Sequence, residues 1–413
     1  MKPVEVVTFG CRLNAYESEL MRQAAEAAGC GNTVVFNTCA VTGEALRQAR
    51  QAIRRARRDS PGARLIAAGC GVEIAPEAFA GMPEVDRVLG NRQKLDSGFY
   101  RPSAPRVAVG PGTSVAGPSP RVEHFRFHSR AFLEVQNGCD HRCTFCIIPF
   151  ARGPSRSVPV AEVVANARRL VGSGYNEIVL TGVDITDYGK DLDGKPSLGR
   201  LVRTLLLEVP ELPRLRLSSI DSVEADDELF RAFAEHERLM PHIHLSLQSG
   251  DDLILKRMKR RHRRADAIAF CRRMREARSD IAFGADVICG FPTETDAMFA
   301  RSLDLADDCG LTYLHVFPFS PRPGTPAARM PQVAPPVARD RAARLRRHGE
   351  RRLRAFLADE VGKTRRILVE RGNRGHTEHH AAVRFREDVM PGRIVNAVIL
   401  RAGDDHLEAR VGA

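Results

Sequence analysis

Three cysteines lie within eight residues of the chain, at Cys139, Cys143 and Cys146. An apolar run typical of a strand, 132–135, precedes them, and the turn Arg152-Gly153 follows. A structural zinc site uses four protein ligands, usually as two short pairs far apart in the sequence, so three cysteines on one loop suit it poorly. A four-iron cluster normally takes one cysteine per iron, so this loop would leave one iron open. The spacing therefore favours an iron–sulfur cluster. The alternatives are redox-silent cysteines or zinc held with a distant histidine.

A second set of three cysteines is spread over the first part of the chain. Cys11, Cys39 and Cys70 each follow a strand-like run. Those runs are 4–8, 33–37 and 64–68. Ligands of open parallel sheets gather at the carboxyl ends of the strands, so we expect these cysteines to converge. A single free cysteine is most often a small buried apolar residue, but the threefold repetition favours a site.

The first loop resembles the defining motif of the radical S-adenosylmethionine (SAM) enzymes. Cys139, Cys143, Phe145 and Cys146 match that motif position for position. In that family the open iron binds the amino and carboxylate groups of S-adenosylmethionine, and an electron from the cluster splits it into methionine and a 5′-deoxyadenosyl radical. The resemblance implies a catalytic 4Fe–4S cluster on the three cysteines, S-adenosylmethionine as cofactor, and Phe145 beside it.

Both cysteine sets together resemble the radical SAM methylthiotransferases, over essentially the whole chain. In that family the dispersed cysteines hold a second 4Fe–4S cluster whose open iron handles the sulfur, which implies Cys11, Cys39 and Cys70 as metal ligands. The segments 8–14, 37–42 and 50–55 look most like the branch that acts on tRNA carrying N6-threonylcarbamoyladenosine. Two features differ from the family. The interval from Cys11 to Cys39 is short, and Gly71 stands where an aromatic residue or alanine is common.

Length, composition and net charge limit the class of protein, although charge alone does not separate RNA from DNA as a partner. The 413 residues are 43% hydrophobic, which predicts two or three domains with proper cores. We find no signal peptide and no run of about 18 apolar residues, so we expect a cytoplasmic protein with no membrane partner. Ten clustered cysteines favour metal ligation in a reducing compartment. The net charge of +12 favours a polyanionic partner.

The first domain, residues 1–98, is expected to be flavodoxin-like, with α/β architecture. A helix is predicted to begin at Asn14, with Glu17 as the partner in a capping box. Thr42 is predicted to cap a second helix. Residues 99–129 are rich in Pro, Gly, Ser and Ala and are predicted to be a linker.

The second domain, residues 130–352, alternates strands and helices. Its predicted strands are 132–135, 177–181, 215–218, 242–247, 282–289 and 313–317. Its predicted helices are 160–171, 198–208, 226–237, 265–277 and 296–308. Six such units are too few for a complete eight-unit barrel, and they suit the partial TIM-like (βα)6 barrel of radical SAM enzymes.

Small and polar residues follow several of these strands. The family resemblance implies that they contact S-adenosylmethionine; the alternative for each is a turn that only needs small or polar residues. The predicted contacts are Gly182, Asp184, Ser219, Gln248 and Gly290.

Two further segments are strongly basic or strand-rich. Residues 257–264 are almost entirely basic, which is typical of a solvated face but also suits tRNA phosphates. After a basic helix at 339–356, short strands are predicted at 366–370, 381–385, 393–399 and 406–410. Residues 353–413 therefore resemble the TRAM domain, a small antiparallel RNA-binding β-barrel. His379 or His380 stands where that family often has an aromatic residue.

The leading hypothesis is a tRNA methylthiotransferase that converts N6-threonylcarbamoyladenosine, in the anticodon stem-loop next to the anticodon, to its 2-methylthio form. A radical is needed because C2 of adenine is neither acidic nor a good electrophile. An external electron donor is expected, and the sulfur donor is not identified. The alternatives are a methylthiotransferase for isopentenyladenosine tRNA or a ribosomal protein, and a non-catalytic iron–sulfur or zinc protein that binds nucleic acid.

Overall fold

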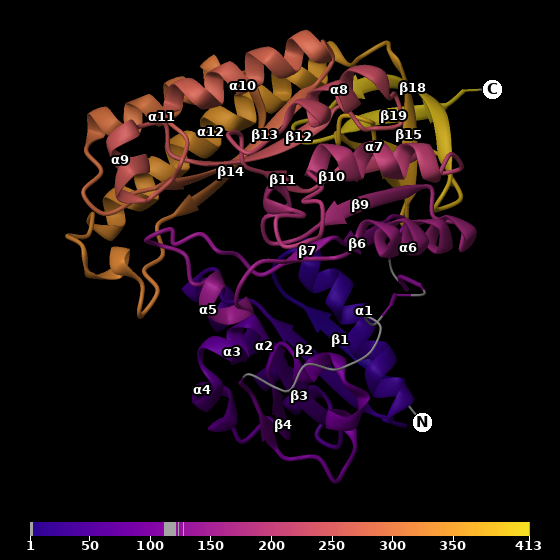
Figure 1. Ribbon diagram of the computed structural model, residues 1–413, viewed down its shortest axis with the longest axis vertical. Coiled ribbons are helices and arrows are strands. Elements are labelled where there is room, and N and C mark those ends of the chain that lie inside the picture. Colours follow the sequence, from indigo (N-terminus) through magenta and orange to yellow (C-terminus); the bar gives the residue numbers. More distant parts are fainter. Residues whose placement is uncertain (1–2, 111–120, 123, 127, 413) are drawn as a thin grey trace. The chain divides into compact units, whose positions relative to one another are not determined.

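The computed structural model describes residues 3–110, 121–122, 124–126 and 128–412, which form two compact units (Figure 1). The first unit is Met1–Arg126, Asn137–Ser155 and Pro321–Thr325, and the second is Phe127–Gln136, Arg156–Ser320 and Pro326–Ala413. Both three-cysteine sets therefore belong to the first unit. The predicted domain boundaries, 1–98, 99–129, 130–352 and 353–413, follow the order of the chain and stay predictions.

The first unit is built on a parallel five-stranded sheet. Its strands are β1 (Glu5–Thr8), β2 (Thr33–Thr38), β3 (Arg64–Gly69), β4 (Arg87–Leu89) and β5 (Val107–Ala108), in that spatial order. In flavodoxins β1 lies between β2 and β3. Here β2 pairs with both β1 and β3, so the α/β class is as predicted but the strand order differs from flavodoxin. As a result, the three strands that precede Cys11, Cys39 and Cys70 are consecutive neighbours.

Helices cover both faces of this sheet. They are α1 (Arg12–Ala27), α2 (Gly43–Asp59), α3 (Cys70–Ile74), α4 (Pro76–Ala80) and α5 (Ile148–Arg152), with short 3-10 turns η1 (Gln93–Leu95) and η2 (Ser97–Tyr100). Met21 of α1 packs with Val35 and Ile66, which alternate along the strands with residues of the opposite face. On that opposite face Ile53 of α2 packs with Phe36.

The predicted helix starts had different outcomes. Thr42 caps α2, because its hydroxyl accepts a hydrogen bond from the amide of Ala45 at 3.1 Å. The prediction for α1 is wrong: the helix begins at Arg12 with Cys11 as its N-cap, not at Asn14. Glu17 is then too far along the helix for a capping box, and its buried carboxylate binds two cations, which are described below.

Part of the predicted linker is ordered. Tyr100 is fully buried and donates a hydrogen bond to the carbonyl oxygen of Lys94 at 2.6 Å. Strand β5 then adds to the edge of the sheet, next to β4. A two-residue strand has no periodicity, so composition alone does not reveal it. Residues 111–120 of the linker lie outside the described residues.

The second unit holds a curved parallel sheet whose strands are in the predicted positions. The strands are β6 (Ala131–Glu134), β9 (Glu177–Thr181), β10 (Arg214–Leu217), β11 (Ser219–Ile220), β12 (His242–Gln248), β13 (Ala282–Cys289) and β14 (Leu311–Pro318). They pair in the orders β6-β9-β10 and β11-β12-β13-β14, and only Ser218 separates β10 from β11 along the chain. This arrangement is the partial barrel expected for six βα units.

Helices follow the strands of this partial barrel, and α10, α11 and α12 cover β12–β14 (Figure 1). The helices are α6 (Val160–Gly172), α7 (Leu198–Glu208), α8 (Asp227–Glu235), α9 (Asp252–Arg257), α10 (Arg264–Ala277), α11 (Asp296–Asp308) and α12 (Pro335–Asp359). Short elements are β7 (Gln136–Asn137), β8 (Arg156–Ser157), η3 (Ile185–Asp187) and η4 (Pro326–Arg329). No helix among the described residues has the length and apolar content required to cross a lipid bilayer.

A small closed β-barrel follows α12, as the resemblance to a TRAM domain implies. Its strands are β15 (Thr364–Glu370), β16 (Arg374–His376), β17 (Ala382–Phe385), β18 (Ile394–Ala402) and β19 (Leu407–Val411), closed in the order β15-β16-β17-β19-β18. All pairs are antiparallel except β17 with β19. Strand β16 was not predicted, because its three residues, Arg-Gly-His, carry no apolar pattern.

A buried charged cluster joins this small barrel to the amino ends of the partial-barrel strands. Glu177, the first residue of β9, is fully buried. Its carboxylate lies 3.4 Å from Arg130, 3.5 Å from Arg214 and 3.0 Å from Arg216. Arg216 also donates a hydrogen bond of 3.1 Å to the carbonyl oxygen of Glu378. One carboxylate therefore holds three arginines, and through them residues of both domains.

His379 and His380 contact the same junction. The Nε2 atom of His379 lies 3.2 Å from a carboxylate oxygen of Asp280. The ring of His380 lies 4.7 Å from that of His376 and 5.1 Å from that of His242. Burial holds the pKa of His380 well below its usual range, so the ring is neutral at pH 7. Both rings therefore take part in the packing of this junction.

Candidate functional site

The three dispersed cysteines converge at the carboxyl edge of the first sheet. Cys11 is the N-cap of α1, Cys39 follows β2, and Cys70 begins α3 directly after β3. Gly10 has φ +94°, and a Cβ atom added to it would lie 2.8 Å from the sulfur of Cys39. The charges of Cys11 and Cys70 both act on Cys39. The structure thus brings the three thiols together, and their role as metal ligands stays a prediction.

The chemistry of these donors fits an iron–sulfur cluster. Burial raises the pKa of the Cys39 thiol to about 11, and burial likewise raises the pKa of Cys11. Thiols with a raised pKa are poor nucleophiles at pH 7, but a bound metal centre deprotonates its thiol ligands by its own positive charge. The set therefore suits metal ligation better than thiol chemistry.

A buried charge network borders these cysteines, and sequence reasoning missed it. Arg152, the last residue of α5, donates hydrogen bonds to Glu17 at 2.8 and 2.9 Å and to Asn14 at 2.7 Å. Lys94 donates to the same carboxylate at 2.7 Å. Asn14 in turn lies 3.9 Å from the sulfur of Cys11. Glu17 and Arg152 are 135 residues apart, so no local pattern could have paired them.

Replacing Glu17 by Gln is expected to remove part of the pH dependence of stability. Burial acts to raise the pKa of Glu17, but Arg152 and Lys94 outweigh it and lower the pKa from 4.5 to about 2. A carboxyl group whose pKa is lowered on folding stabilises the protein above pH 4.5, and this contribution is lost as the pH falls towards 2. We expect the unfolding free energy of the metal-free wild type to fall by about 3 kcal/mol more over this window than that of Glu17→Gln, in urea titrations.

The matched control for this measurement is Glu26→Gln, because Glu26 is an exposed carboxylate that pairs with Arg22. It should follow the wild type at every pH. Equal pH dependence in Glu17→Gln and wild type would contradict the prediction.

The loop with the other three cysteines is fixed by its backbone. Gly138 has φ +75°, and a Cβ atom there would lie 1.8 Å from the carbonyl oxygen of Pro154. The amide of Cys139 donates to the carbonyl oxygen of Gly153 at 3.1 Å, and that of Cys146 donates to Cys143 at 3.1 Å. The three thiols are half-buried on one loop. Such a compact three-thiol loop fits a cluster with one open iron.

The two cysteine sets pack close to one another within the first unit. Ile147 and Ala151, which follow the loop, share an apolar cluster with Ala40 and Cys70. Asn91 donates hydrogen bonds to the carbonyl oxygen of Ala151 at 2.7 Å and to the sulfur of Cys70 at 3.6 Å. The segment after one set thus supports the ligand residues of the other.

The predicted S-adenosylmethionine contacts in the second unit lie at strand ends. Gly182 and Asp184 follow β9, Ser219 begins β11, Gln248 ends β12 and Gly290 follows β13. The side-chain oxygen of Gln136 accepts hydrogen bonds from the amides of Val183 and Asp184 at 3.0 and 2.9 Å, which fixes the first turn. Gln248 has φ +68°, a strained conformation that clusters at functional sites. The contacts of these residues and of Phe145 with the cofactor stay predictions.

Gly290 has a packing reason of its own. It has φ +71°, and a Cβ atom added to it would lie 2.4 Å from the Cβ of Ala338 in α12. Its amide donates to the carboxylate of Glu294 at 2.8 Å. The close approach of α12 therefore explains the glycine without any ligand.

A polar cluster on β12–β14 was also missed from the sequence. His244 Nε2 lies 3.0 Å from Asp286 Oδ1, and His315 Nδ1 lies 3.4 Å from the same oxygen. Burial acts to raise the pKa of Asp286, but the two histidines lower it below its usual range. The residues come from three adjacent strands, so only the strand pairing unites them. The cluster places two imidazole rings beside one carboxylate on this face of the sheet.

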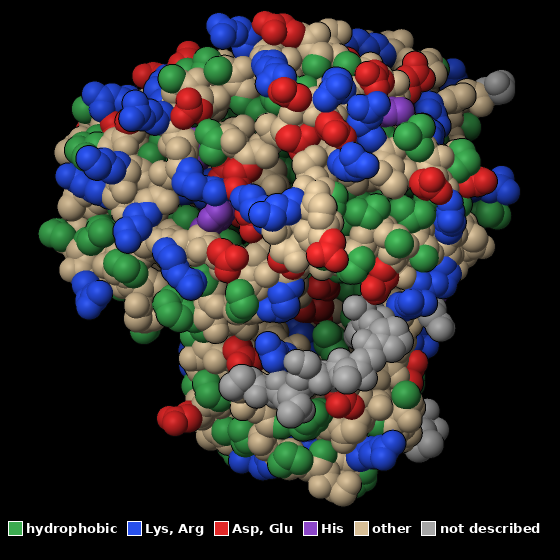
Figure 2. Space-filling model, viewed as in Figure 1, with side chains coloured by type: hydrophobic (Ala, Val, Ile, Leu, Met, Phe, Trp, Pro, Cys, Tyr) green, Lys and Arg blue, Asp and Glu red, His purple; other side chains and the backbone are tan. Residues whose placement is uncertain are grey.

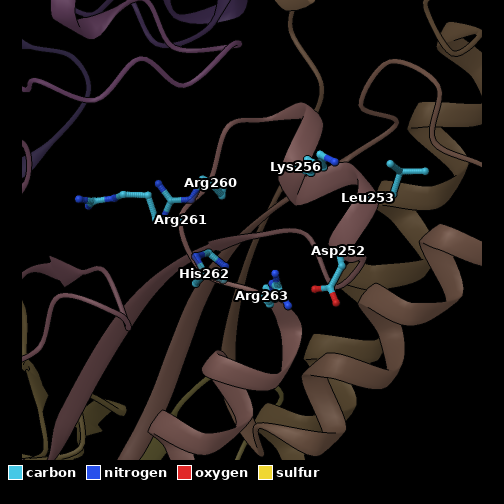
Figure 3. Close-up of a pocket in the computed structure, with 7 residues that line it drawn as sticks. All are labelled: Asp252, Leu253, Lys256, Arg260, Arg261, His262 and Arg263. Carbon is cyan, nitrogen blue, oxygen red and sulfur yellow. The ribbon is translucent and has the colours of Figure 1, made fainter.

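The basic run between α9 and α10 borders a pocket of about 600 Å³ (Figure 3). Arg260 and Arg261 extend together on the side away from Asp252, where they bind Asp221 and Glu224. His262 is buried, with its Nε2 atom 3.1 Å from the carbonyl oxygen of Leu247. In contrast, three exposed cations of this segment form no ion pair with any described residue. These are Lys256, Lys259 and Arg263, which we call the open cations.

Further Lys and Arg side chains lie over the part of the second unit that holds α9–α11 (Figure 2). Asp and Glu side chains are interspersed among them on the face shown. Because charges of both signs are mixed on this surface, it has no uniform positive potential. Any attraction of the open cations for an anion is therefore local.

Family comparisons match most of the chain. The Radical SAM superfamily matches residues 133–306, and "Uncharacterized protein family UPF0004" matches residues 3–90. Among solved structures, the radical S-adenosylmethionine methyltransferase TsrM from Kitasatospora setae aligns with a TM-score of 0.57 at 15% identity, over 79% of this chain and 77% of that one. That similarity shows the fold.

Curated relatives share much more of the sequence. The threonylcarbamoyladenosine tRNA methylthiotransferase MtaB of Rickettsia prowazekii is 48% identical over 98% of this chain and 96% of its own. The enzyme of the same name from Bacillus subtilis is 32% identical over 99% and 96%. A tRNA-2-methylthio-N(6)-dimethylallyladenosine synthase of Novosphingobium aromaticivorans is 34% identical over 99% and 97%. The chain therefore belongs to the radical S-adenosylmethionine methylthiotransferases, in the branch whose members are named threonylcarbamoyladenosine tRNA methylthiotransferases.

Proposed function

We propose that this enzyme converts N6-threonylcarbamoyladenosine, next to the anticodon of tRNA, to its 2-methylthio form. The observation that carries the proposal is 48% identity, along nearly the whole chain, to an enzyme named for this substrate. The small closed barrel and the net charge of +12 support an RNA substrate. A tRNA substrate also supports action in the cytoplasm.

Membership of the radical SAM superfamily implies S-adenosylmethionine and a 4Fe–4S cluster. We assign the ligands of that cluster to Cys139, Cys143 and Cys146, whose loop leaves one coordination position open. When bound there, the cluster supplies the electron that cleaves S-adenosylmethionine, and an external donor must replace that electron. The backbone around Gly138, which leaves no room for a Cβ atom, fixes the start of the loop and supports this assignment.

A second 4Fe–4S cluster on Cys11, Cys39 and Cys70 is part of the proposal. Support comes from the convergence of three thiols on one sheet edge, of which Cys39 and Cys70 are buried and Cys11 is exposed. Arg152, held by Glu17, places positive charge beside Cys11 and Cys39 and so opposes part of the rise in their pKa values that burial causes. In this proposal the first site activates C2 of adenine and the second provides the methylthio group.

The open cations are expected to contribute to tRNA affinity through phosphate contacts. Replacing Lys256, Lys259 and Arg263 together by Ala should weaken tRNA binding, and should reduce the slope of log affinity against log salt by up to about 3. Filter-binding titrations at several salt concentrations measure both. Cleavage of S-adenosylmethionine without tRNA should be unchanged.

Lys195→Ala is the control for a general charge effect, because Lys195 is exposed, lies far from this segment in sequence and forms no ion pair with a described residue. An unchanged salt slope in the triple variant would contradict a role of the open cations.

Nucleoside mass spectrometry of tRNA tests the substrate. A deletion strain should lose 2-methylthio-N6-threonylcarbamoyladenosine and regain it on complementation with this chain. Loss of the 2-methylthio-isopentenyl nucleoside instead would favour the second candidate, which the 34% identical dimethylallyladenosine synthase suggests. If the tRNA nucleosides are unchanged and a ribosomal protein loses its methylthio group instead, the enzyme would be a methylthiotransferase for that protein.

A further inference from the structure

Arg322 is a buried arginine without a counter-charge. It lies in Pro321–Thr325, the segment that belongs to the first unit although it follows β14. The residue is only 4% exposed. Its Nε atom is buried without a hydrogen-bond partner, and no ion pair joins its guanidinium group to a described residue. Arginine is almost never fully buried unless paired, so this site lacks a partner that the folded protein should have.

The backbone around Arg322 forms a rigid turn. Its carbonyl oxygen accepts hydrogen bonds from the amide of Thr325 at 3.1 Å and from the hydroxyl of Thr325 at 2.8 Å. Pro323 and Gly324, with φ +88°, occupy the central positions as a type II turn requires. The turn fixes the point from which the side chain extends, so its burial is not an accident of a flexible loop.

Cys39 is the ionisable residue whose charge acts on Arg322. Burial lowers the pKa of the guanidinium group, and the Cys39 sulfur, when it is deprotonated, opposes this fall. Arg152, the other arginine at this site, is fully engaged with Glu17 and Asn14. Among the residues that the structure describes, Arg322 is therefore a cation that acts on this site and retains a free donor.

Charge compensation at the site indicates what the missing partner is. The buried charged groups that border the cysteines, Arg152, Lys94 and Glu17, together carry one positive charge, and Arg322 adds a second. Three thiolates around an oxidised four-iron core carry one net negative charge. A monoanionic ligand on the open iron would supply a second negative charge, and the site would then be neutral.

We propose that Arg322 binds the sulfur anion, hydrosulfide or methanethiolate, that sits on the open iron of a cluster held by Cys11, Cys39 and Cys70. The inference rests on the proposed function, because it requires that cluster. The planar guanidinium group presents several donors in a fixed fork, so it can both neutralise and orient one anion. Arg322 thus becomes an anion-binding residue of the sulfur-handling site.

The test uses the full chain with Cys139, Cys143 and Cys146 replaced by Ala, so that only the second cluster is present. After anaerobic reconstitution, sodium hydrosulfide or sodium methanethiolate is titrated in while the electron paramagnetic resonance spectrum of the reduced cluster is recorded. Arg322→Met should weaken binding of both anions at least about tenfold and leave the iron content unchanged. Arg322→Lys, which keeps the charge, should weaken it less.

Arg329→Met is the matched control, since Arg329 is an exposed arginine seven positions further along. It should bind both anions like the parent chain. The reduction potential gives a second readout: loss of a buried positive charge in Arg322→Met should make the cluster harder to reduce, and Arg329→Met should not change it.

Three outcomes separate the explanations. Unchanged anion affinity in Arg322→Met with full iron content overturns the inference. Loss of iron from both Arg322→Met and Arg322→Lys also overturns it, because the residue would then hold the fold and not the anion. A parent chain that holds no iron on Cys11, Cys39 and Cys70 contradicts the proposed function itself, and the inference falls with it.

Discussion

Cys143→Ala is expected to abolish the formation of 5′-deoxyadenosine from S-adenosylmethionine. Cys143 lies on the fixed loop between Gly138 and Gly153. The substitution removes one of the three thiols proposed to hold the catalytic cluster. An incomplete ligand set should lower cleavage by several orders of magnitude, because the cluster proposed to supply the electron would lose one of its three ligands. Chromatography of the reaction with dithionite as reductant measures the product.

Cys39→Ala should have a different effect. It removes a thiol from the second set, so S-adenosylmethionine cleavage should persist while methylthiolation of tRNA is lost. Cys30→Ala is the control, because Cys30 is a half-buried cysteine whose sulfur bonds the carbonyl oxygen of Tyr100 outside both sets. Equal loss of both activities in Cys143→Ala and Cys39→Ala would indicate one shared cluster or misfolding, which retained iron and circular dichroism distinguish.

Glu177→Gln is expected to destabilise the second unit strongly. The amide keeps the shape of the side chain but leaves Arg130, Arg214 and Arg216 without their common anion. Burial acts to raise the pKa of Glu177, but the three arginines hold it below its usual range, so the native group is charged at pH 7. Breaking a buried ion pair costs about 3–5 kcal/mol, and denaturant titration should show a loss of this size.

The control for Glu177 is Glu208→Gln, because Glu208 pairs with Arg168 at the surface and both side chains are 55% exposed. Exposed ion pairs contribute little to the free energy of unfolding, so Glu208→Gln should lower it by less than about 1 kcal/mol. Because this cluster also holds the small barrel, we expect Glu177→Gln to make the chain near β15 and β16 more accessible to proteases. A variant as stable as the wild type would show that Arg216 is held by the backbone of Thr377 and Glu378 alone.

Local sequence was sufficient for the elements that carry the cysteines. The apolar runs before Cys11, Cys39 and Cys70 are strands β1, β2 and β3, and all six predicted strands of the second unit are present. Such runs are fixed by short-range preferences for burial and extended backbone. Predictions from local sequence were wrong where a residue that matches a local motif binds a partner far away in the chain. Glu17 matched a capping box, but its carboxylate is buried against Arg152 and Lys94.

The sequence by itself indicated radical S-adenosylmethionine chemistry, because the spacing of Cys139, Cys143 and Cys146 is set by their order along the chain. That spacing does not depend on the fold. Only the tertiary structure decided which charges surround the sites. The pairs Glu17 with Arg152, Glu177 with Arg216 and Arg322 with Cys39 are far apart along the chain. Their interactions depend on burial and proximity, which arise only when the sheets assemble. That is why the unpaired guanidinium of Arg322, and the anion it is proposed to bind, emerged from the structure alone.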